Sequence, residues 1–308
     1  MSVAAPLVRE PGGLRLWQND SQSSSARRRL GEIVHPAPMI DLHCHMLPGI
    51  DDGAPDEATS LEMARIAVAD GIETTACTPH IYPGLYENDA ADIKTRIKAL
   101  QSRLFDEGIA LKLTIGADAH LTPELLGRLK AGTAPSLAGG RYFLLEPPHT
   151  IAPPRFSESM FDFVTAGYVP VLTHPERLSW IKQHYAVFVA LVKSGVWMQI
   201  TAGSLNGRFG EAAKYFGEKM LDDGLVHILA TDAHSTRHRA PLLAEGQRAA
   251  EKYVGKDEAR RLVFDRPQAI LDNRPPREVA PIPALRDDSV DGARRGFLSR
   301  VMDRARRK

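Results

Sequence analysis

The chain has 308 residues, 43% of them hydrophobic and 25% charged, with a formal net charge of +1. This length suits one large α/β domain with tails, and the near-zero charge argues against an extended nucleic-acid surface. Two cysteines exclude a disulfide framework, and no apolar run reaches the roughly 18 residues that a spanning helix needs. We therefore expect a cytoplasmic protein.

The two ends differ from the middle of the chain. Residues 1–37 are polar and of low complexity, and we expect a disordered extension. Residues 274–308 begin as a Pro-rich linker and end in a basic tail, in which Phe297, Leu298, Val301 and Met302 recur at helical spacing. The tail is either a frayed, solvated helix or a docking helix for a partner or an anionic membrane surface.

Between the tails, residues 38–273 alternate β-rich runs with helical segments. We expect helices at Ala58–Asp70, Asp89–Glu107, Pro123–Ala131, Glu158–Ala166, Tyr185–Ser194 and Glu211–Asp223, each followed by glycine. Such a glycine closes the last helical turn in the left-handed conformation. We expect seven strands, at Pro38–His43, Glu73–Thr78, Leu111–Gly116, Tyr142–Glu146, Val169–Thr173, Val196–Thr201 and Val226–Thr231. This order predicts an α/β fold with parallel strands.

Polar side chains that suit a metal stand where these runs end. They are His43, His45, His80, Asp118, Glu146, His174, Asp232 and His234. One histidine after a strand is usually an ordinary core or loop residue. The same event after six of seven strands indicates a parallel barrel, whose strand ends converge on one face.

The ligand types indicate an open, catalytic metal site. Asp41, His43 and His45 alternate along one run, which predicts that they point to one side. Asp41 is expected to orient a ligand, and Cys44 to be a packed hydrophobe. Imidazoles and carboxylates without thiolates suit Mn, Fe or Zn in such a site. The other histidines are interpreted as ordinary loop or core residues: His35, His120, His149, His184, His227 and His238.

Two arginines follow ligand positions. Arg177 comes three residues after His174, and Arg239 comes five residues after His234. A guanidinium group binds phosphate oxygens in a bidentate way, so metals with arginines favour a phosphate-like substrate. A solvated loop position is the alternative for each arginine.

These motifs together resemble those of a known family. They are MIDLHCHMLPGIDDGA at residues 39–54, SLEMA at 60–64, TPH at 78–80, HPER at 174–177, Ser204–Leu205, Phe209–Gly210 and DAH at 232–234. The chain resembles the PHP-type (polymerase and histidinol phosphatase superfamily) tyrosine-protein phosphatases of bacterial capsule and exopolysaccharide loci. This resemblance implies a distorted seven-stranded (β/α)7 barrel, up to three ions, usually Mn²⁺, and dephosphorylation of the tyrosine-rich tail of a partner kinase.

The resemblance also implies three metal positions. Their ligands would be His43, His45, Asp118 and Asp232 for the first, Asp118, Glu146 and His174 for the second, and Asp52, His80 and His234 for the third. The family usually has glutamate at the position of Asp118. A carboxylate that is one methylene shorter is expected to bridge two metals less well.

The predicted mechanism is hydrolysis by a water that the metals activate, with Arg177 and Arg239 holding phosphate oxygens. Asp232 or a metal-held water would be the acid. A cysteine-based phosphatase is excluded, because Ile50 and Pro83 stand where its arginine would follow Cys44 or Cys77. Tyr82, Tyr86 and Phe209 either line the entrance or pack as ordinary loop residues. A small-molecule phosphatase, such as one acting on histidinol phosphate, and a non-catalytic scaffold stay open as alternatives.

Overall fold

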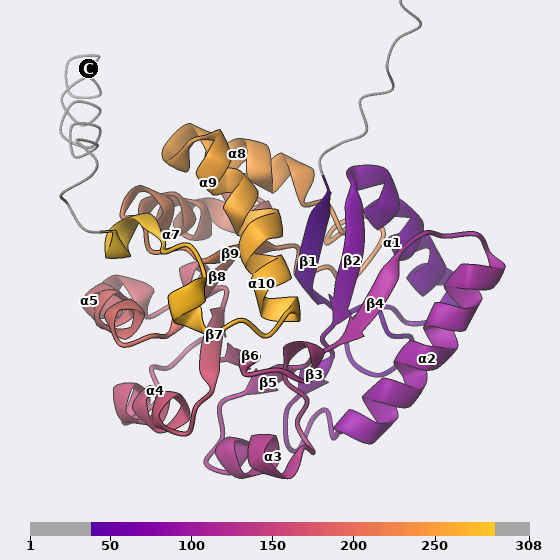
Figure 1. Cartoon of the computed structure of the whole chain (residues 1–308), viewed down its shortest axis with the longest axis horizontal. Helices are drawn as coiled ribbons and strands as arrows, with labels where there is room; N and C mark the ends of the chain where they lie inside the picture. Colours follow the sequence, from indigo (N-terminus) through magenta and orange to yellow (C-terminus); the bar gives the residue numbers. More distant parts are fainter. Residues whose placement is uncertain (1–37, 287–308) are drawn as a thin grey trace, which may run out of the picture. The chain divides into compact units, whose positions relative to one another are not determined.

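The computed structural model describes residues 38–286 (Figure 1). The expectations for residues 1–37 and for the basic tail after residue 286 lie outside the described residues. Among residues 38–286, no helix combines the length and the apolar character that a membrane span requires.

All strand ladders in the described region are parallel, as expected for an α/β fold. One sheet has the order β1 (Met39–Cys44), β2 (Ile72–Cys77), β4 (Lys112–Ile115). The other has the order β3 (His80–Ile81), β5 (Asp118–His120), β6 (Tyr142–Glu146), β7 (Val169–Thr173), β8 (Trp197–Thr201), β9 (Ile228–Ala230). The described residues therefore form sheets of three and six strands instead of the seven strands expected.

Two of the expected strands, which correspond to β2 and β4, are each followed by a further short strand that joins the other sheet. Thr78 and Pro79 separate β2 from β3, and Pro79 has no N–H group to donate to a ladder. Gly116 and Ala117 separate β4 from β5, and a Cβ at Gly116 would lie 2.9 Å from Thr78 and from Leu137 side-chain atoms. The chain bends at both points, which the composition of the apolar runs did not reveal.

Backbone hydrogen bonds also link the first strand to the last. The N–H of Asp232 donates to the carbonyl of His43 at 2.8 Å, and the N–H of His45 donates to the carbonyl of Ala233 at 2.8 Å. The ends of β1 and of the segment after β9 therefore lie side by side. This contact is what brings the first and last ligand motifs together.

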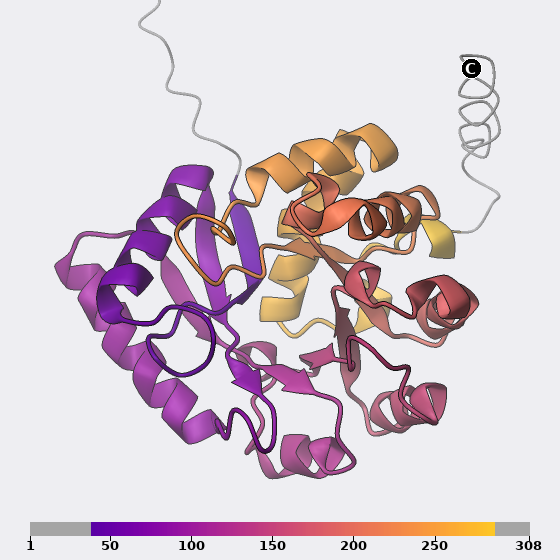
Figure 2. The ribbon, with the colours of Figure 1, turned by 180° about the vertical axis from the view of Figure 1, so that it is seen from behind.

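The six expected helices are all present, and they lie around the outside of the strands (Figures 1 and 2). They are α1 (Glu57–Asp70), α2 (Ala90–Asp106), α3 (Leu125–Ala131), α4 (Phe156–Thr165), α5 (Ile181–Lys193) and α7 (Gly210–Asp222). Each of the six glycines expected after them has a positive φ, as Gly71 does with φ 98°. Asp56 and Asp89 cap α1 and α2 by accepting backbone hydrogen bonds in the first turn. Helix α5 begins four residues before the expected start, and His184 inside it is non-helical.

The sequence did not predict the remaining helices, which are α6 (Ala202–Leu205), α8 (Ala244–Val254), α9 (Lys256–Arg260) and α10 (Arg266–Leu271). Between α9 and α10, Arg261–Asp265 form a π-helical turn. Pro267 follows this turn and lacks the N–H group that a regular helix would use. Ile270 of α10 packs in a buried cluster with strand residues that include Leu42, Tyr142, Val171 and Trp197.

The folded unit continues beyond the expected boundary at residue 273. The hydroxyl of Tyr142 donates to the carbonyl of Arg274 at 2.8 Å, and Ile282 is buried. Arg266 is fully buried and donates to Glu258 at 2.5 Å and to the carbonyls of Ala280 and Pro281. Part of the expected linker is thus packed against the core.

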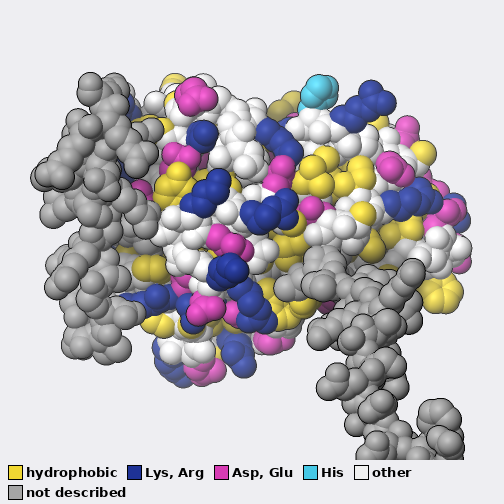
Figure 3. All heavy atoms as spheres, turned by 90° about the horizontal axis from the view of Figure 1, so that it is seen from above, with side chains coloured by type: hydrophobic (Ala, Val, Ile, Leu, Met, Phe, Trp, Pro, Cys, Tyr) yellow, Lys and Arg dark blue, Asp and Glu magenta, His cyan; other side chains and the backbone are white. Residues whose placement is uncertain are grey.

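The face drawn in Figure 3 carries basic and acidic side chains next to one another, with hydrophobic side chains between them. Such mixing agrees with the formal net charge of +1 and does not produce a field of one sign on this face.

Candidate metal centre

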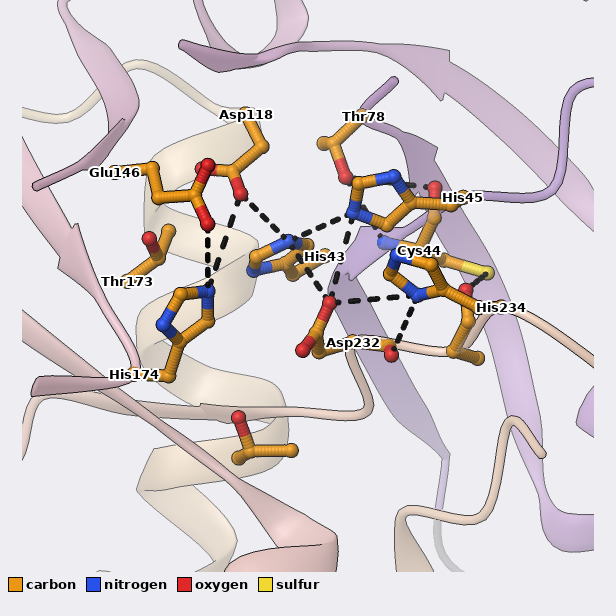
Figure 4. A network of polar contacts seen from close by, with 12 residues as sticks. His43, Cys44, His45, Thr78, Asp118, Glu146, Thr173, His174, Asp232 and His234 are labelled. Carbon is orange, nitrogen blue, oxygen red and sulfur yellow. Dashed lines mark hydrogen bonds and ion pairs between the residues drawn. The ribbon is translucent and has the colours of Figure 1, made fainter. Parts of the chain in front are cut away.

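The expected ligand side chains do converge on one place, most of them at or just after the last residue of a strand, whereas His80 and Asp118 are the first residues of β3 and β5. His43 and His45 come from the end of β1, His80 from β3, Asp118 from β5, and Glu146 from the last residue of β6. His174 follows β7, while Asp232 and His234 follow β9. Figure 4 shows His43 at the centre, with Asp118 on one side and Asp232 and His45 on the other. Parallel strands bring these distant residues to one place.

The donor atoms are close enough to share cations. The Nε2 atom of His43 lies 3.1 Å from Nε2 of His45, 3.4 Å from Oδ2 of Asp118 and 3.3 Å from Oδ1 of Asp232. On one side of it, His174 Nε2 is 3.7 Å from Oε1 of Glu146. On the other side, Oδ1 of Asp52 lies 3.5 Å from His80 and 3.4 Å from His234. All nine expected ligands therefore belong to one continuous cluster.

Neighbouring groups fix which ring nitrogen faces the cluster. Nδ1 of His43 pairs with Oε1 of Gln199 at 2.8 Å, and Nδ1 of His45 pairs with Oδ2 of Asp51 at 2.8 Å. Nδ1 of His234 lies 3.0 Å from the carbonyl of Asp232. Each pairing occupies Nδ1 and leaves Nε2 toward the centre, an arrangement typical of metal-binding histidines.

Several buried oxygen and nitrogen atoms that could bind a metal have no hydrogen-bond partner among the described residues. They are both carboxylate oxygens of Asp118, Nδ1 of His80, Nδ1 of His174 and Nε2 of His234. Buried polar atoms normally have a hydrogen-bond partner, so most of these atoms are suited to bind cations instead. Groups of three or more potential ligands within 4.8 Å of one another include His45 with Asp52, His80 and His234, and His43 with Asp118 and His174.

The local charges favour ionised carboxylates in the cluster. Burial would raise the pKa of Asp232, but His43, Arg239 and Arg177 hold it well below its usual range. Burial disfavours a charged His43, yet Asp118 and Asp232 raise its pKa to about 9. Burial and the nearby His234 lower the pKa of His45 to about 3. The cluster thus mixes anionic oxygens with imidazoles, the donor set expected from the sequence.

Both expected arginines reach Asp232. Arg177 forms an ion pair with Oδ2 of Asp232, and Arg239 donates to the same oxygen at 2.6 Å. The guanidinium carbons lie 4.2 Å and 5.8 Å from the centre of the Phe209 ring. Phe209 therefore supports the arginines.

The first strand is less regular than expected. Its register with β2 shifts between Asp41 and Cys44, so the alternation of sides is interrupted there. Asp41 accepts hydrogen bonds from the N–H and hydroxyl of Thr231 and from the N–H of His43. Asp41 thus holds the backbone at His43 and at Thr231, the residue before Asp232, and its role in orienting a ligand stays a prediction.

A family model for capsular polysaccharide synthesis, CpsB/CapC, matches residues 39–272. The chain belongs to the CpsB/CapC family. This confirms the family that the motifs indicated.

Individual relatives of this CpsB/CapC chain carry phosphatase names. Tyrosine-protein phosphatase YwqE of Bacillus subtilis (strain 168) is 39% identical over 220 residues, covering 71% of this chain and 86% of YwqE. Tyrosine-protein phosphatase CpsB of Streptococcus pneumoniae is 26% identical over 240 residues, covering 76% and 98%. A chain from the crystal structures of YwqE and CpsB, unique metal-dependent tyrosine phosphatases, is similar with a TM-score of 0.74 and 36% identity. That match covers 77% of this chain and 96% of the other.

Four residues at the CpsB/CapC site were not expected from the sequence. Gln199 and Asp51 contact His43 and His45, as described above. His149 Nε2 lies 3.1 Å from Glu146, and His120 Nδ1 lies 3.8 Å from it, so both side chains contact an expected ligand. His120 is the parallel partner of Glu146 in the β5–β6 ladder, and His149 follows Glu146 by three residues. The three-residue spacing to Glu146 was the available signal for His149, whereas the contact of His120 depends on the strand register.

The aromatic residues expected at the entrance divide into two sets. The Tyr86 ring stacks on His80 with centroids 5.6 Å apart, and the Tyr82 ring stacks on His120 at 4.0 Å. Phe209 lies under the arginines instead. The loop after β3 therefore covers imidazoles of the cluster and its neighbour His120.

The cysteines are placed as expected for packed side chains. Cys44 and Cys77 are both buried. Burial raises the pKa of Cys44 well above its usual value and raises that of Cys77 to about 12. Neither thiol resembles an activated nucleophile, which needs a lowered pKa.

Proposed function

We propose that this chain is a metal-dependent tyrosine-protein phosphatase that acts in the cytoplasm on a partner bacterial tyrosine kinase of capsule or exopolysaccharide synthesis. The observation that carries the proposal is the continuous cluster of nine imidazole and carboxylate ligands with two arginines on one of its carboxylates. The names of the YwqE and CpsB relatives support the choice of phosphotyrosine as substrate.

We assign up to three ions to the cluster. His43, His45, Asp118 and Asp232 would hold the first, Asp118, Glu146 and His174 the second, and Asp52, His80 and His234 the third. The placement of Asp118 within 4.0 Å of His43, His80 and His174 supports a bridging role. Mn²⁺ is the proposed ion, with Fe and Zn as alternatives, because no thiolate takes part. In fold terms, we propose that the two sheets together act as one distorted seven-stranded barrel.

When bound, the ions supply Lewis-acid activation of a water and neutralise phosphate charge. The residues of the chain do the rest. Arg177 and Arg239 would bind the equatorial phosphate oxygens through their forks of N–H groups. Asp232 holds both guanidinium groups through one oxygen, and we propose that it positions them in addition to binding a cation. The phenolate leaving group has a pKa near 10, so it needs little help from an acid.

The test is phosphate release from a phosphotyrosine peptide by the full chain, with histidinol phosphate as the competing substrate. We expect the peptide to be the better substrate, loss of activity on chelation, and recovery that is best with Mn²⁺ among Mn²⁺, Fe²⁺ and Zn²⁺. Preference for histidinol phosphate would favour the small-molecule alternative. Full activity after long incubation in excess chelator would contradict the metal mechanism, and absence of bound metal with no activity would favour the scaffold.

A further inference from the structure

A cavity of about 350 Å³ lies next to the metal centre, within the roughly 300–1,000 Å³ range of ligand pockets. It lies between the loop after β6, the segment that leads into α5, and the start of α7. Its lining residues include His149, Arg177, Ile181, Phe209, Ala212 and Phe216. No part of the mechanism above uses this space.

Two of the lining residues also contact the metal centre. Arg177 forms the ion pair with Asp232, and His149 contacts Glu146 at 3.1 Å. The cavity and the centre therefore share a wall. A substrate whose phosphate is held at the centre must place its neighbouring groups close to this opening.

Although the exposed Lys182 also lines the cavity, its buried and aromatic side chains suit an apolar group better than a second phosphate. Ile181 is buried, and the Phe209 and Phe216 side chains add aromatic surface. Arg177 is already engaged by Asp232, and its guanidinium lies 4.2 Å from the Phe209 ring. A phosphate that contacts Arg177 would lie at the edge of the cavity, next to the metal centre. The rest of the cavity would then be free for a part of the substrate further from the phosphate.

We propose that this cavity is a subsite for a bulky apolar side chain that flanks the phosphotyrosine in a peptide substrate. The inference rests on the proposed function. An extended peptide advances about 3.3 Å per residue, so residues within a few positions of the phosphotyrosine can reach a cavity that shares a wall with the centre. Burying one large apolar side chain contributes about 1.5–3 kcal/mol. The cavity would thus select peptides by sequence beside the phosphorylated residue.

The experiment uses the full chain with Mn²⁺ and phosphotyrosine peptides whose flanking residues are alanine, or carry one phenylalanine at each of three positions on either side. We expect one phenylalanine position to raise kcat/KM about tenfold over the alanine peptide, the order expected for one well-buried apolar group. Ala212→Trp places a large ring at the exposed mouth of the cavity and should abolish this preference. Hydrolysis of free phosphotyrosine should change less than twofold.

The matched control is Ala186→Trp, the same change at an exposed position of α5 that does not line the cavity. It should keep the preference. Calorimetry with non-hydrolysable phosphonate analogues of the same peptides measures binding apart from turnover. Active enzyme without preference at any position overturns the subsite alone. Equal loss on free phosphotyrosine and peptide in Ala212→Trp would place the phosphorylated ring itself in the cavity. Failure of the wild type to hydrolyse or bind any of these compounds would overturn the proposed function.

Discussion

The Asp118 carboxylate lies among three imidazoles, whereas Asp52 contacts two and has a side chain that is 49% exposed. We expect Asp118→Ala to lower phosphatase activity by at least about 100-fold, and to cost more than Asp52→Ala, because it removes a ligand shared by two proposed ions. Metal stoichiometry and kcat for the two variants measure this directly. Full occupancy and full rate in Asp118→Ala would show that Asp118 is not a ligand.

The length of the Asp118 side chain is a separate test. Its Oδ2 atom is 4.0 Å from Nε2 of His174 but 3.4 Å from Nε2 of His43. One more methylene would extend the carboxylate toward the second proposed ion, so Asp118→Glu should tighten Mn²⁺ binding and raise activity at limiting Mn²⁺. Titration of activity with Mn²⁺ decides the question, and weaker binding in Asp118→Glu would contradict a strained bridge.

Arg239 contacts Asp232 through one terminal nitrogen, which leaves the rest of its planar fork for a phosphate. We expect Arg239→Lys to lower kcat by about tenfold or more with little change in KM, since lysine lacks the fork that follows the oxygens into the transition state. Arg237→Lys is the control, because Arg237 is exposed and has no expected role. An unchanged kcat in Arg239→Lys would leave Arg239 as an ordinary loop residue.

At the scale of elements, the loop between β1 and α1 carries two site residues. Asp51 accepts from His45 Nδ1, from the N–H of Gly53 at 2.9 Å and from the N–H of His80 at 3.0 Å. A Cβ at Gly53 would lie 2.2 Å from the carbonyl oxygen of His45, so the loop cannot keep its place with any side chain there. The loop thus acts as a single support for ligands from two strands.

We expect Gly53→Ala to fold but to lose about tenfold or more in metal affinity and activity, because Asp51 and Asp52 must move with the loop. Far-UV circular dichroism and Mn²⁺ titration separate folding from binding. Gly127→Ala is the control, since its added Cβ meets no atom within 4 Å and lies in helix α3. Wild-type metal affinity in Gly53→Ala would rule out a supporting role for this loop.

At the scale of the whole molecule, Glu258 connects α9 to the segment that ends the described chain. It accepts from the buried Arg266 at 2.5 Å, from Arg261 at 3.0 Å, and it pairs with Arg286. Glu258→Ala would leave Arg266 buried without its counter-charge, and we expect a loss of about 3–5 kcal/mol in the free energy of unfolding. Urea denaturation measures it, with the exposed Glu278→Ala as control. Equal stability of the two variants would contradict this account.

The same pair has a defined pH dependence. Burial would raise the pKa of Glu258, but Arg266, together with Arg261 and Arg286, lowers it below the ordinary 4.5. A carboxyl with a lowered folded-state pKa stabilises fully above its unfolded-state value, and the contribution is lost as pH falls through the folded-state pKa. The stability difference between wild type and Glu258→Ala should therefore be largest near neutral pH and shrink below pH 4.5.

The sequence by itself determined the local units and the ligand types. Glycine after each of the six expected helices predicts a left-handed turn, and an apolar run predicts a buried strand. Both predictions are possible because these features depend on neighbouring residues alone. Histidines and carboxylates at the ends of successive strands could be assigned to one centre, because parallel strands end on the same side. The grouping of Glu146 with His174 came instead from the family resemblance of the motifs.

Only the tertiary structure decided the contacts that depend on bends and loops. After the breaks at Pro79 and Gly116 the chain forms two further strands in the other sheet, and the Asp41 carboxylate accepts from Thr231. Gln199 lies 156 residues from the His43 ring that it orients, and no sequence pattern near either residue predicts this contact. A local sequence pattern predicts where a strand forms. The partner of a buried ring nitrogen depends instead on which chain segments the packed core brings within hydrogen-bond distance.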